Sequence, residues 1–555
     1  MLDMHLNQMK TIRNFIFLAI GFLFISFSQT PPTSFIIRNG TIIDGLGNPS
    51  FKSDLLLKDG IMKLIRPGEK VEAQVMIDAS GLIVAPGFID VHSHTDQALL
   101  NPDNKLNEGV IRQGVTTIVG GPDGMLSPSR LSYMLGVYAK NGIGTNVAFY
   151  IGHNGIRGRV MKRDQQREPT PEELNQMKEM VREGMDMGAV GLSTGLMYEP
   201  GMYSQTQEVI ELAKEVAPYS GIYDSHVRNP VHAFVASHRE AIEITTKANI
   251  PGKLGHLKAV GLHNEGTIQE IITMVEKFRD EGFEIVSDQY PYDGAATSNL
   301  MSIIIIPTDI EESQSFNRFV AGGNRDEAKK VLQSLMKDAM KSSQIKEVSE
   351  QGEDGGFSWL KATGYSSMRI TSSKDYPELV GKYLSEIAED SNNDPFEVVC
   401  ELIINAKENV NITLGAIKEK DVQTLLIQPW NMIASDGAYV DPSKPSQGHP
   451  RSTGTFPRLL GHYVRELNLL SLEEAVRKIT SFPADFIGLK ERGRIKDGIN
   501  GDIVIFNPET IIDNSTFEQP TLYASGIVHV FVNGVPVLQD SEMTGNAPGQ
   551  YLKRK

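Results

Sequence analysis

Short apolar runs that end in polar residues recur along the middle of the chain and predict buried strands. These runs end near His94, Val119, Tyr150, Ser193, Tyr223, Leu257, Asp288 and Ala434. Between most of them the apolar positions follow a helical period, as in residues 171–187 and 205–217. About eight strand–helix units are what a (β/α)8 barrel requires. We therefore expect an α/β fold whose TIM-like barrel spans residues 86–489.

The two ends of the chain have a different pattern, in which short strands are separated by turns. The strand-like runs are residues 35–44, 54–62, 502–506 and 527–534. Asn39-Gly40 and Asp59-Gly60 are residue pairs that favour β-hairpins. We expect one small β-sandwich built from both ends, with residues 29–85 as its N-terminal part and 490–555 as its C-terminal part.

A stretch over about residues 308–375 interrupts the barrel pattern before the last strand. It is rich in Ser, Lys and Glu and contains Gly355-Gly356. We interpret it as an insertion over the barrel mouth, and two roles remain open. Either it covers the site as a lid, or it is a solvent-exposed loop without a role at the site.

The first 28 residues have the pattern of a signal peptide. Lys10 and Arg13 precede an almost wholly apolar run from Phe15 to Phe27, and Ser28 is a small residue of the kind found before a cleavage site. The run is shorter than the roughly 20 residues that span a bilayer. We expect an exported protein, periplasmic or secreted, with no stable membrane insertion.

Composition changes this picture only by exclusion. Of the 555 residues, 40% are hydrophobic and 22% are charged, as in ordinary globular enzymes. The net charge of −15 and the lack of a basic patch argue against a nucleic-acid partner. Cys400 is the only cysteine and lies in an apolar helical run. We therefore predict no intramolecular disulfide and a buried structural thiol.

Two histidines at the end of the first barrel strand are candidates for metal ligands. The apolar run before them ends in His92-Ser-His94. Side chains in a strand alternate between its faces, so His92 and His94 point the same way. Neutral imidazoles that converge at a strand end are suitable ligands for a divalent metal such as zinc.

Four further polar residues close strand-like runs. Asp123 follows the second strand, His226 the fifth, His256 the sixth and Asp436 the eighth. With the histidine pair they place four histidines and two carboxylates at one barrel mouth, which is enough for one or two metal ions and a group for acid–base chemistry. His153 ends the third strand, where it either lines the pocket or has a structural role. We expect His238 on a helix surface.

From about residue 35 to its C-terminus the chain resembles the D-aminoacylase, or N-acyl-D-amino-acid deacylase, family of the amidohydrolase superfamily. The motifs that carry the resemblance are Pro86-Gly-Phe-Ile-Asp-Val-His-Ser-His94, Gly188-Ala-Val-Gly-Leu-Ser-Thr-Gly-Leu196 with Tyr198 and Pro200-Gly201, Asp288-Gln-Tyr-Pro-Tyr292, Ser435-Asp436-Gly437, His449-Pro-Arg451 and Gly454-Thr-Phe-Pro-Arg458. The resemblance implies a barrel flanked by a two-ended β-sandwich. It also implies zinc-dependent hydrolysis of N-acyl-D-amino acids or D-dipeptides.

The resemblance also implies roles for individual residues. Asp123, His226 and His256 match the ligands of a tightly held zinc, whereas His92, His94 and Asp436 match a second, weaker metal cluster. Asp436 matches the residue that passes a proton from the attacking water to the leaving amine. Three further residues match positions that hold the substrate carboxylate: Lys258, Tyr290 and Arg451.

The chain departs from the family pattern at one metal ligand. Where the family has a cysteine in Gly-Asn-Cys-Gly, this chain has Gly121-Pro-Asp123-Gly124. A carboxylate is a harder ligand than a thiolate, so we expect weaker zinc binding with one metal ion or two.

The sequence leaves two alternative functions open. One is a dipeptidase or cyclic amidase of the same superfamily, many of which use a carboxylated lysine after strand four. This chain has Ser193-Thr-Gly-Leu there and no lysine, which argues against it. The other is a non-catalytic binding protein on the same scaffold, which would have no need of Asp436 as a proton shuttle. The sequence leaves the oligomeric state open.

Overall fold

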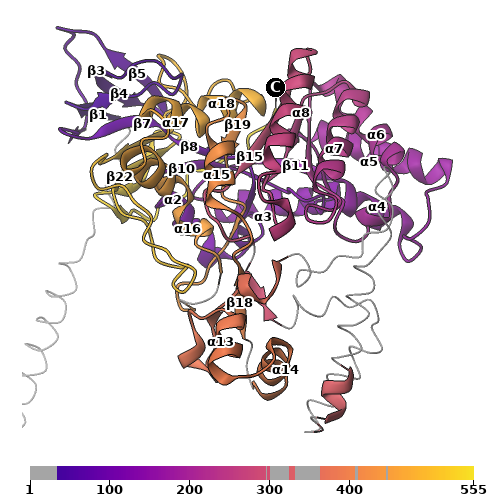
Figure 1. The fold of residues 1–555 in the computed structure, drawn as a ribbon. Helices are drawn as coiled ribbons and strands as arrows, with labels where there is room; N and C mark the ends of the chain where they lie inside the picture. The colour runs from indigo at the N-terminus through magenta and orange to yellow at the C-terminus, as the bar shows by residue number, and fades with distance from the viewer. Residues whose placement is uncertain are drawn as a thin grey trace, which may run out of the picture.

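A computed structural model describes residues 34–295, 297–300, 324, 326–331, 363–406, 410–444 and 448–554 (Figure 1). The expected signal peptide, residues 1–28, lies outside the described residues, as does most of the expected insertion at 308–375. Within the described part of the chain, no helix is both long enough and apolar enough to cross a membrane.

Eight parallel strands form the barrel expected from the apolar runs. In spatial order they are β19, β15, β14, β13, β12, β11, β10 and β8. Their bounds are β8 Phe88–Asp90, β10 Val115–Gly120, β11 Asn146–Gly152, β12 Gly191–Gly195, β13 Ile222–His226, β14 Gly252–Leu254, β15 Ile285–Gln289 and β19 Asn431–Ile433. The first and last strands meet through β9 (Ser93–His94), which pairs in parallel with β20 (Gly437–Ala438). The predicted barrel is confirmed.

Helices cover the outside of the barrel (Figure 1). They are α3 Pro128–Asn141, α4 His153–Met161, α5 Pro171–Asp186, α6 Thr206–Lys214, α7 Phe234–Ala248, α8 Ile268–Asp280, α15 Glu419–Leu426, α16 Arg451–Arg458, α17 Leu472–Lys478 and α18 Ser481–Phe486. The start of α5 follows from sequence, because Thr170 and Glu173 form a reciprocal capping box around Pro171. Its apolar stripe, which includes Met177 and Val181, is buried against the barrel core.

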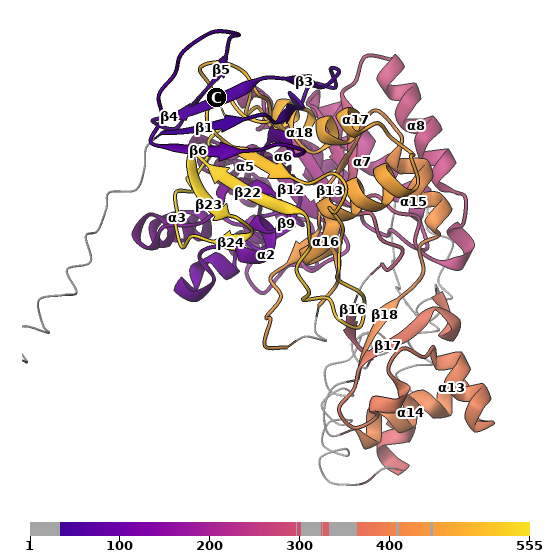
Figure 2. The ribbon, with the colours of Figure 1, turned by 90° about the vertical axis from the view of Figure 1, so that its left-hand side faces the viewer.

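Two sheets at one side of the barrel form the expected β-sandwich from both chain ends (Figure 2). The first, in the order β5-β4-β1-β6, contains β1 Ser34–Arg38, β4 Asp54–Lys58, β5 Ile61–Ile65 and β6 Val75–Asp78. The second, in the order β24-β23-β22-β21-β7-β2-β3, contains β2 Thr41–Ile42, β3 Phe51–Lys52, β7 Ile83–Pro86, β21 Ile503–Phe506, β22 Ile527–Val532, β23 Val535–Gln539 and β24 Glu542–Met543. Phe35 and Phe531 pack edge to face between them, with ring centroids 5.1 Å apart.

The two expected hairpin turns have different outcomes. Asp59 and Gly60 both have positive φ, at 52° and 81°, and join the antiparallel pair β4 and β5. Asn39-Gly40 does not form a hairpin, because β1 and β2 belong to different sheets. A Cβ on Gly40 would lie 2.6 Å from Val84 Cγ2, so this glycine allows the chain to pass closely between the sheets.

A small subdomain lies between β15 and β19, apart from the barrel wall (Figures 1 and 2). It contains β16 Thr297–Asn299, β17 Met368–Ser372, β18 Asn411–Leu414, α13 Leu384–Ser391 and α14 Pro395–Asn405. Cys400 is free and buried in α14, as predicted for a structural thiol.

Candidate metal centre

The six candidate ligands come together at the C-terminal ends of five barrel strands. His92 and His94 follow β8, Asp123 follows β10, His226 ends β13, His256 follows β14, and Asp436 follows β19. Residues that are far apart in the sequence meet here because the barrel brings the carboxyl ends of its parallel strands to one rim.

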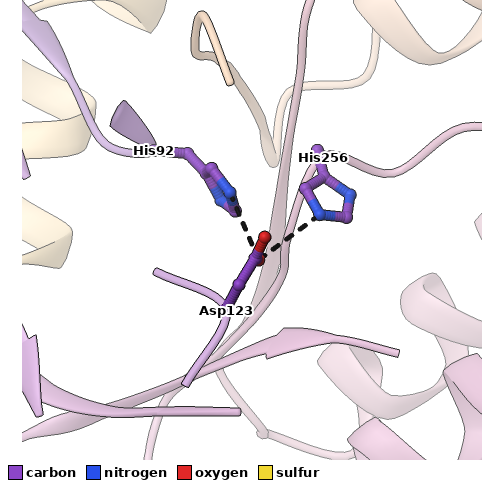
Figure 3. Close-up of side chains that lie close together, drawn as sticks. All are labelled: His92, Asp123 and His256. Carbon is purple, nitrogen blue, oxygen red and sulfur yellow. Dashed lines mark ion pairs between the residues drawn. The ribbon is translucent and has the colours of Figure 1, made fainter. Parts of the chain in front are cut away.

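Asp123 lies within ion-pair distance of four histidines, two of which, His92 and His256, are drawn with it in Figure 3. Its Oδ1 is 3.5 Å from His92 Nε2, and 3.6 Å from both His226 Nδ1 and His256 Nε2. Its Oδ2 is 3.6 Å from His94 Nε2. The two oxygens of one carboxylate therefore face different histidines.

Asp436 is the second carboxylate of the cluster. Its Oδ1 lies 3.2 Å from His94 Nε2 and 3.6 Å from His92 Nε2. Its Oδ2 lies 2.7 Å from Arg451 Nη1 and 4.0 Å from Lys258 Nζ. This carboxylate thus stands between the histidine cluster and two cations.

The residues fit a divalent metal. His92 Nε2 and Asp123 Oδ1 are buried, and neither has a hydrogen-bond partner among the described residues. Two groups have ligand atoms within 4.8 Å of one another, His92–Asp123–His256 and His92–His94–Asp436. Ligands placed tetrahedrally about zinc at 2.0–2.2 Å are separated by roughly 3.4 Å, close to the distances found here. His92 belongs to both groups, whereas the family resemblance implied a place for it in the second alone.

The protonation states of His256 and Asp123 suit a metal. Burial and the nearby Lys258 lower the pKa of His256 to about 3, which keeps its imidazole neutral. Burial alone would raise the pKa of Asp123, but His226 and His256 outweigh it and hold the pKa well below its usual range. Asp123 is therefore a carboxylate at neutral pH. At His94 burial is outweighed by Asp436 and Asp123, which raise its pKa to about 9, so a metal that binds there must displace a proton.

An unusual backbone conformation with positive φ sets the direction of three of these side chains. Asp123, His256 and Asp436 have φ of 58°, 36° and 47°, in the left-handed region that L residues rarely adopt. The hydroxyl of Ser193 on β12 donates to Gly121 O and accepts from Gly124 N, at 2.7 and 3.1 Å. A side chain of β12, the second strand along from β10 in the barrel, thereby fixes the turn that carries Asp123.

The three residues expected to hold a substrate carboxylate lie beside Asp436. The Arg451 guanidinium is 4.6 Å and Lys258 Nζ is 5.0 Å from the centre of the Tyr290 ring. Burial lowers the pKa of Lys258 to about 8, although Asp436 opposes this change. Lys258, Arg451 and Tyr290 thus form a partly buried cationic corner around the Asp436 carboxylate.

Comparison with known proteins agrees with this arrangement. The family model described as "Amidohydrolase family" matches residues 75–217 and 403–538. The D-aminoacylase of Alcaligenes xylosoxydans xylosoxydans is 32% identical over 552 residues, which cover 96% of this chain and 99% of that protein. This chain belongs to the amidohydrolase family.

Two further relatives of this amidohydrolase are N-acyl-D-glutamate deacylases. The one from Alcaligenes xylosoxydans xylosoxydans is 29% identical over 94% of this chain and 96% of that protein. The crystal structure of the one from Bordetella bronchiseptica, complexed with zinc and a phosphonate inhibitor, has a TM-score of 0.73. It is 29% identical to this chain, and the alignment covers 94% of this chain and 99% of that one.

Sequence reasoning missed a buried charge cluster beneath the metal centre. Lys253 Nζ lies 3.1 Å from Asp224, forms an ion pair with Asp288 and is 3.5 Å from His92 Nδ1. Asp288 also accepts from the backbone N–H of His256. Strand alternation would have found Asp224, which precedes His226 by two residues and shares its face.

Two other histidines of this amidohydrolase lie away from the centre. His153 Nε2 is 2.8 Å from Glu208 Oε1, in a buried cluster with Arg157 that links α4 to α6. His153 therefore has the structural role. His238 was expected on a surface, but it is buried in α7, with Nδ1 2.6 Å from Phe234 O.

Proposed function

We propose that this amidohydrolase hydrolyses N-acyl-D-amino acids. The reaction adds water across the amide bond, so that the acyl carbon becomes a carboxylate and the nitrogen leaves as the free amine of a D-amino acid. The observation that carries the proposal is the position of Asp436, whose two oxygens face His94 on one side and Arg451 on the other. A proton acceptor thereby stands between the metal ligands and the cations that would hold a carboxylate.

The metal-binding residues of the proposal are the four histidines with Asp123 and Asp436. Zinc, when bound, makes a water molecule more acidic and polarises the amide carbonyl. Asp123 faces both ligand groups with different oxygens, so the site suits one ion or two. Its oxygen donors are harder than sulfur and favour harder divalent metals than a thiolate would.

Asp436 would carry the proton. Burial would raise its pKa, but Arg451 and then His256 outweigh this effect, so the pKa stays well below its usual range. The group is therefore an unprotonated carboxylate that can accept a proton from the attacking water. It would then deliver this proton to the leaving nitrogen as the C–N bond breaks.

Lys258, Arg451 and Tyr290 would bind the carboxylate of the amino acid. The two cations are balanced by Asp436 alone within the corner, which leaves positive charge for an anionic substrate. The guanidinium is suited to two parallel hydrogen bonds with a carboxylate. We infer that a substrate with a free carboxylate is preferred over its amide.

The test is a hydrolysis screen with the metal-loaded full-length chain. It compares N-acyl-D-amino acids, their L enantiomers and the corresponding D-amino-acid amides, and it measures released amine. We expect the D acids to be cleaved with the highest kcat/KM. Equal kcat/KM for the acid and the amide would contradict carboxylate binding by the cationic corner. A preference for the L form would contradict the proposed substrate class.

The Lys258→Met variant sharpens this screen. It should raise KM for the D acid more than it lowers kcat, and it should change KM for the amide little, because only the acid loses an ionic partner. A solvent-exposed lysine on α7, Lys247, provides the matched Lys247→Met control.

We also propose that the protein is exported. The support is the basic and apolar pattern of residues 1–28, as described in the sequence analysis. N-terminal sequencing of the protein from its native host should find a mature chain that begins near Gln29. Full-length chain in the cytoplasm would contradict export.

A further inference from the structure

An open pocket adjoins the metal centre. Its volume is about 590 Å³, and its walls include His94 and Asp123. Asp436, Lys258, Tyr290 and Arg451 are absent from its lining. The pocket and the cationic corner therefore adjoin the same metal ligands but are lined by different residues.

The proposed reaction assigns this pocket to the acyl group. The amino-acid carboxylate and side chain are both attached to the carbon next to the leaving nitrogen, so they lie with Lys258 and Arg451. The acyl chain is attached to the carbonyl carbon, which must lie at the metal ligands. The chain then extends away from the cations, into the pocket beside His94 and Asp123.

The free surface of the pocket is apolar. Pro122, Met125 and Leu126, on the loop after β10, face Tyr198, on the loop after β12. Met125 is 59% exposed and Tyr198 is 40% exposed, which is unusual for large hydrophobic side chains that lie together.

The polar side chains of the pocket already have partners. Arg130 Nη2 donates to Gln97 Oε1 at 2.6 Å, and Gln97 Nε2 donates to Asp96 at 3.4 Å. Glu199 accepts from the Tyr203 hydroxyl. Gln97 and Glu199 thus already have polar partners, and the rest of the wall offers an incoming group mainly apolar contact.

From this geometry we propose that the pocket binds an apolar acyl chain longer than acetyl. The inference rests on the proposed function and names its substrate class, medium-chain N-acyl-D-amino acids. A volume of about 590 Å³ is in the range of pockets that enclose a drug-sized ligand, roughly 300–1,000 Å³. An acetyl group offers a single methyl and would leave most of this space unfilled.

The experiment measures kcat/KM of the zinc-loaded full-length chain for the N-acetyl, N-butanoyl, N-hexanoyl and N-octanoyl derivatives of one D-amino acid. Each buried methylene should raise kcat/KM roughly fourfold until the pocket is full. Met125→Gln keeps the side-chain length but adds polarity, and should lower the octanoyl-to-acetyl ratio by roughly fivefold to tenfold. Met76, which is 66% exposed on β6 of the sandwich, provides the control Met76→Gln, which should leave the ratio unchanged.

A second measurement needs no turnover. Calorimetry with acetate and octanoate, the carboxylate products of the two extreme substrates, should show tighter binding of octanoate and a selective loss in Met125→Gln. If no N-acyl-D-amino acid of any length is cleaved, the proposed function fails, and this measurement alone decides the pocket. A flat or falling chain-length series, or octanoate that binds no better than acetate, would overturn the inference.

Discussion

Nη1 of Arg451 lies 2.7 Å from Oδ2 of Asp436. The other oxygen of this carboxylate points to His94, so one side chain connects the cationic corner to the metal ligands. A proton on Asp436 would therefore lie near the metal ligands, which would face the acyl carbon of a substrate. It would also lie near Arg451, which would face the substrate's carboxylate.

The first prediction concerns this carboxylate. Asp436→Asn should lower kcat for N-acyl-D-amino acids by roughly 10²–10⁴-fold, because an amide cannot accept and return a proton at neutral pH. KM should change much less. Asp280→Asn, at the exposed end of α8, is the control. Circular dichroism should match the wild type, and most of the bound metal should remain. Turnover within a few-fold of the wild type would mean that another group carries the proton.

The second prediction concerns metal stoichiometry. Asp123→Ala should remove all tightly bound metal, because its two oxygens face both ligand groups. His94→Ala should remove at most one of two equivalents, because His94 belongs to one group only. Metal analysis after dialysis measures this, with His462→Ala as a control outside the cluster. Equal losses in the Asp123 and His94 variants would indicate one coupled site.

The third prediction concerns the cluster beneath the centre. Lys253 is fully buried between Asp224 and Asp288, so Lys253→Met would leave two carboxylates without their cation. The free energy of unfolding should fall by about 3–5 kcal/mol. Lys247→Met, which breaks an exposed pair with Glu243, should change it by less than about 0.5 kcal/mol. Urea unfolding measures both, and similar values for the two variants would exclude a stabilising role for Lys253.

The fourth prediction concerns pH and the pair between α4 and α6. Burial would raise the pKa of Glu208, but His153 and then Arg157 lower it below the ordinary 4.5. Because the folded-state pKa is depressed, the unfolded chain takes up the proton first as the pH falls. The stabilisation by Glu208 is therefore complete above about pH 5 and is lost as the pH falls through the folded-state pKa.

Glu208→Gln tests this sign. At pH 7 it should lower the free energy of unfolding by roughly 1–3 kcal/mol, and the difference from the wild type should shrink towards pH 4. Glu172→Gln, at an exposed position on α5, should show no such change with pH. A constant difference between pH 7 and pH 4 would contradict the assigned pKa direction.

Local patterns in the sequence determined the fold class. Strands of a parallel barrel are buried on both faces, so each appears as a nearly continuous apolar run, and all eight were found this way. The start of α5 depends on Thr170 and Glu173, which are three residues apart. The hairpin at Asp59-Gly60 depends on two adjacent residues with positive φ. Interactions between residues so close in the sequence depend on residue types that can be read directly from it.

The candidate ligands were also visible in the sequence, because each follows a strand and the barrel places strand ends at one rim. Their arrangement was not visible. That Asp123 faces four histidines, and that His92 belongs to both ligand groups, depends on distances between strands that are remote in sequence.

Only the tertiary structure decided the partners of the remaining residues. Asn39-Gly40 has a turn sequence, and Asn39 has the positive φ of 63° that such a turn favours, yet the turn joins strands of two different sheets. His153 turns to Glu208, and Lys253 lies between two aspartates from neighbouring strands. The pocket beside the metal centre is formed by loops after β10 and β12, which meet only when the barrel is closed. A sequence specifies local conformation through neighbouring residues, whereas these contacts exist only after distant segments have packed together.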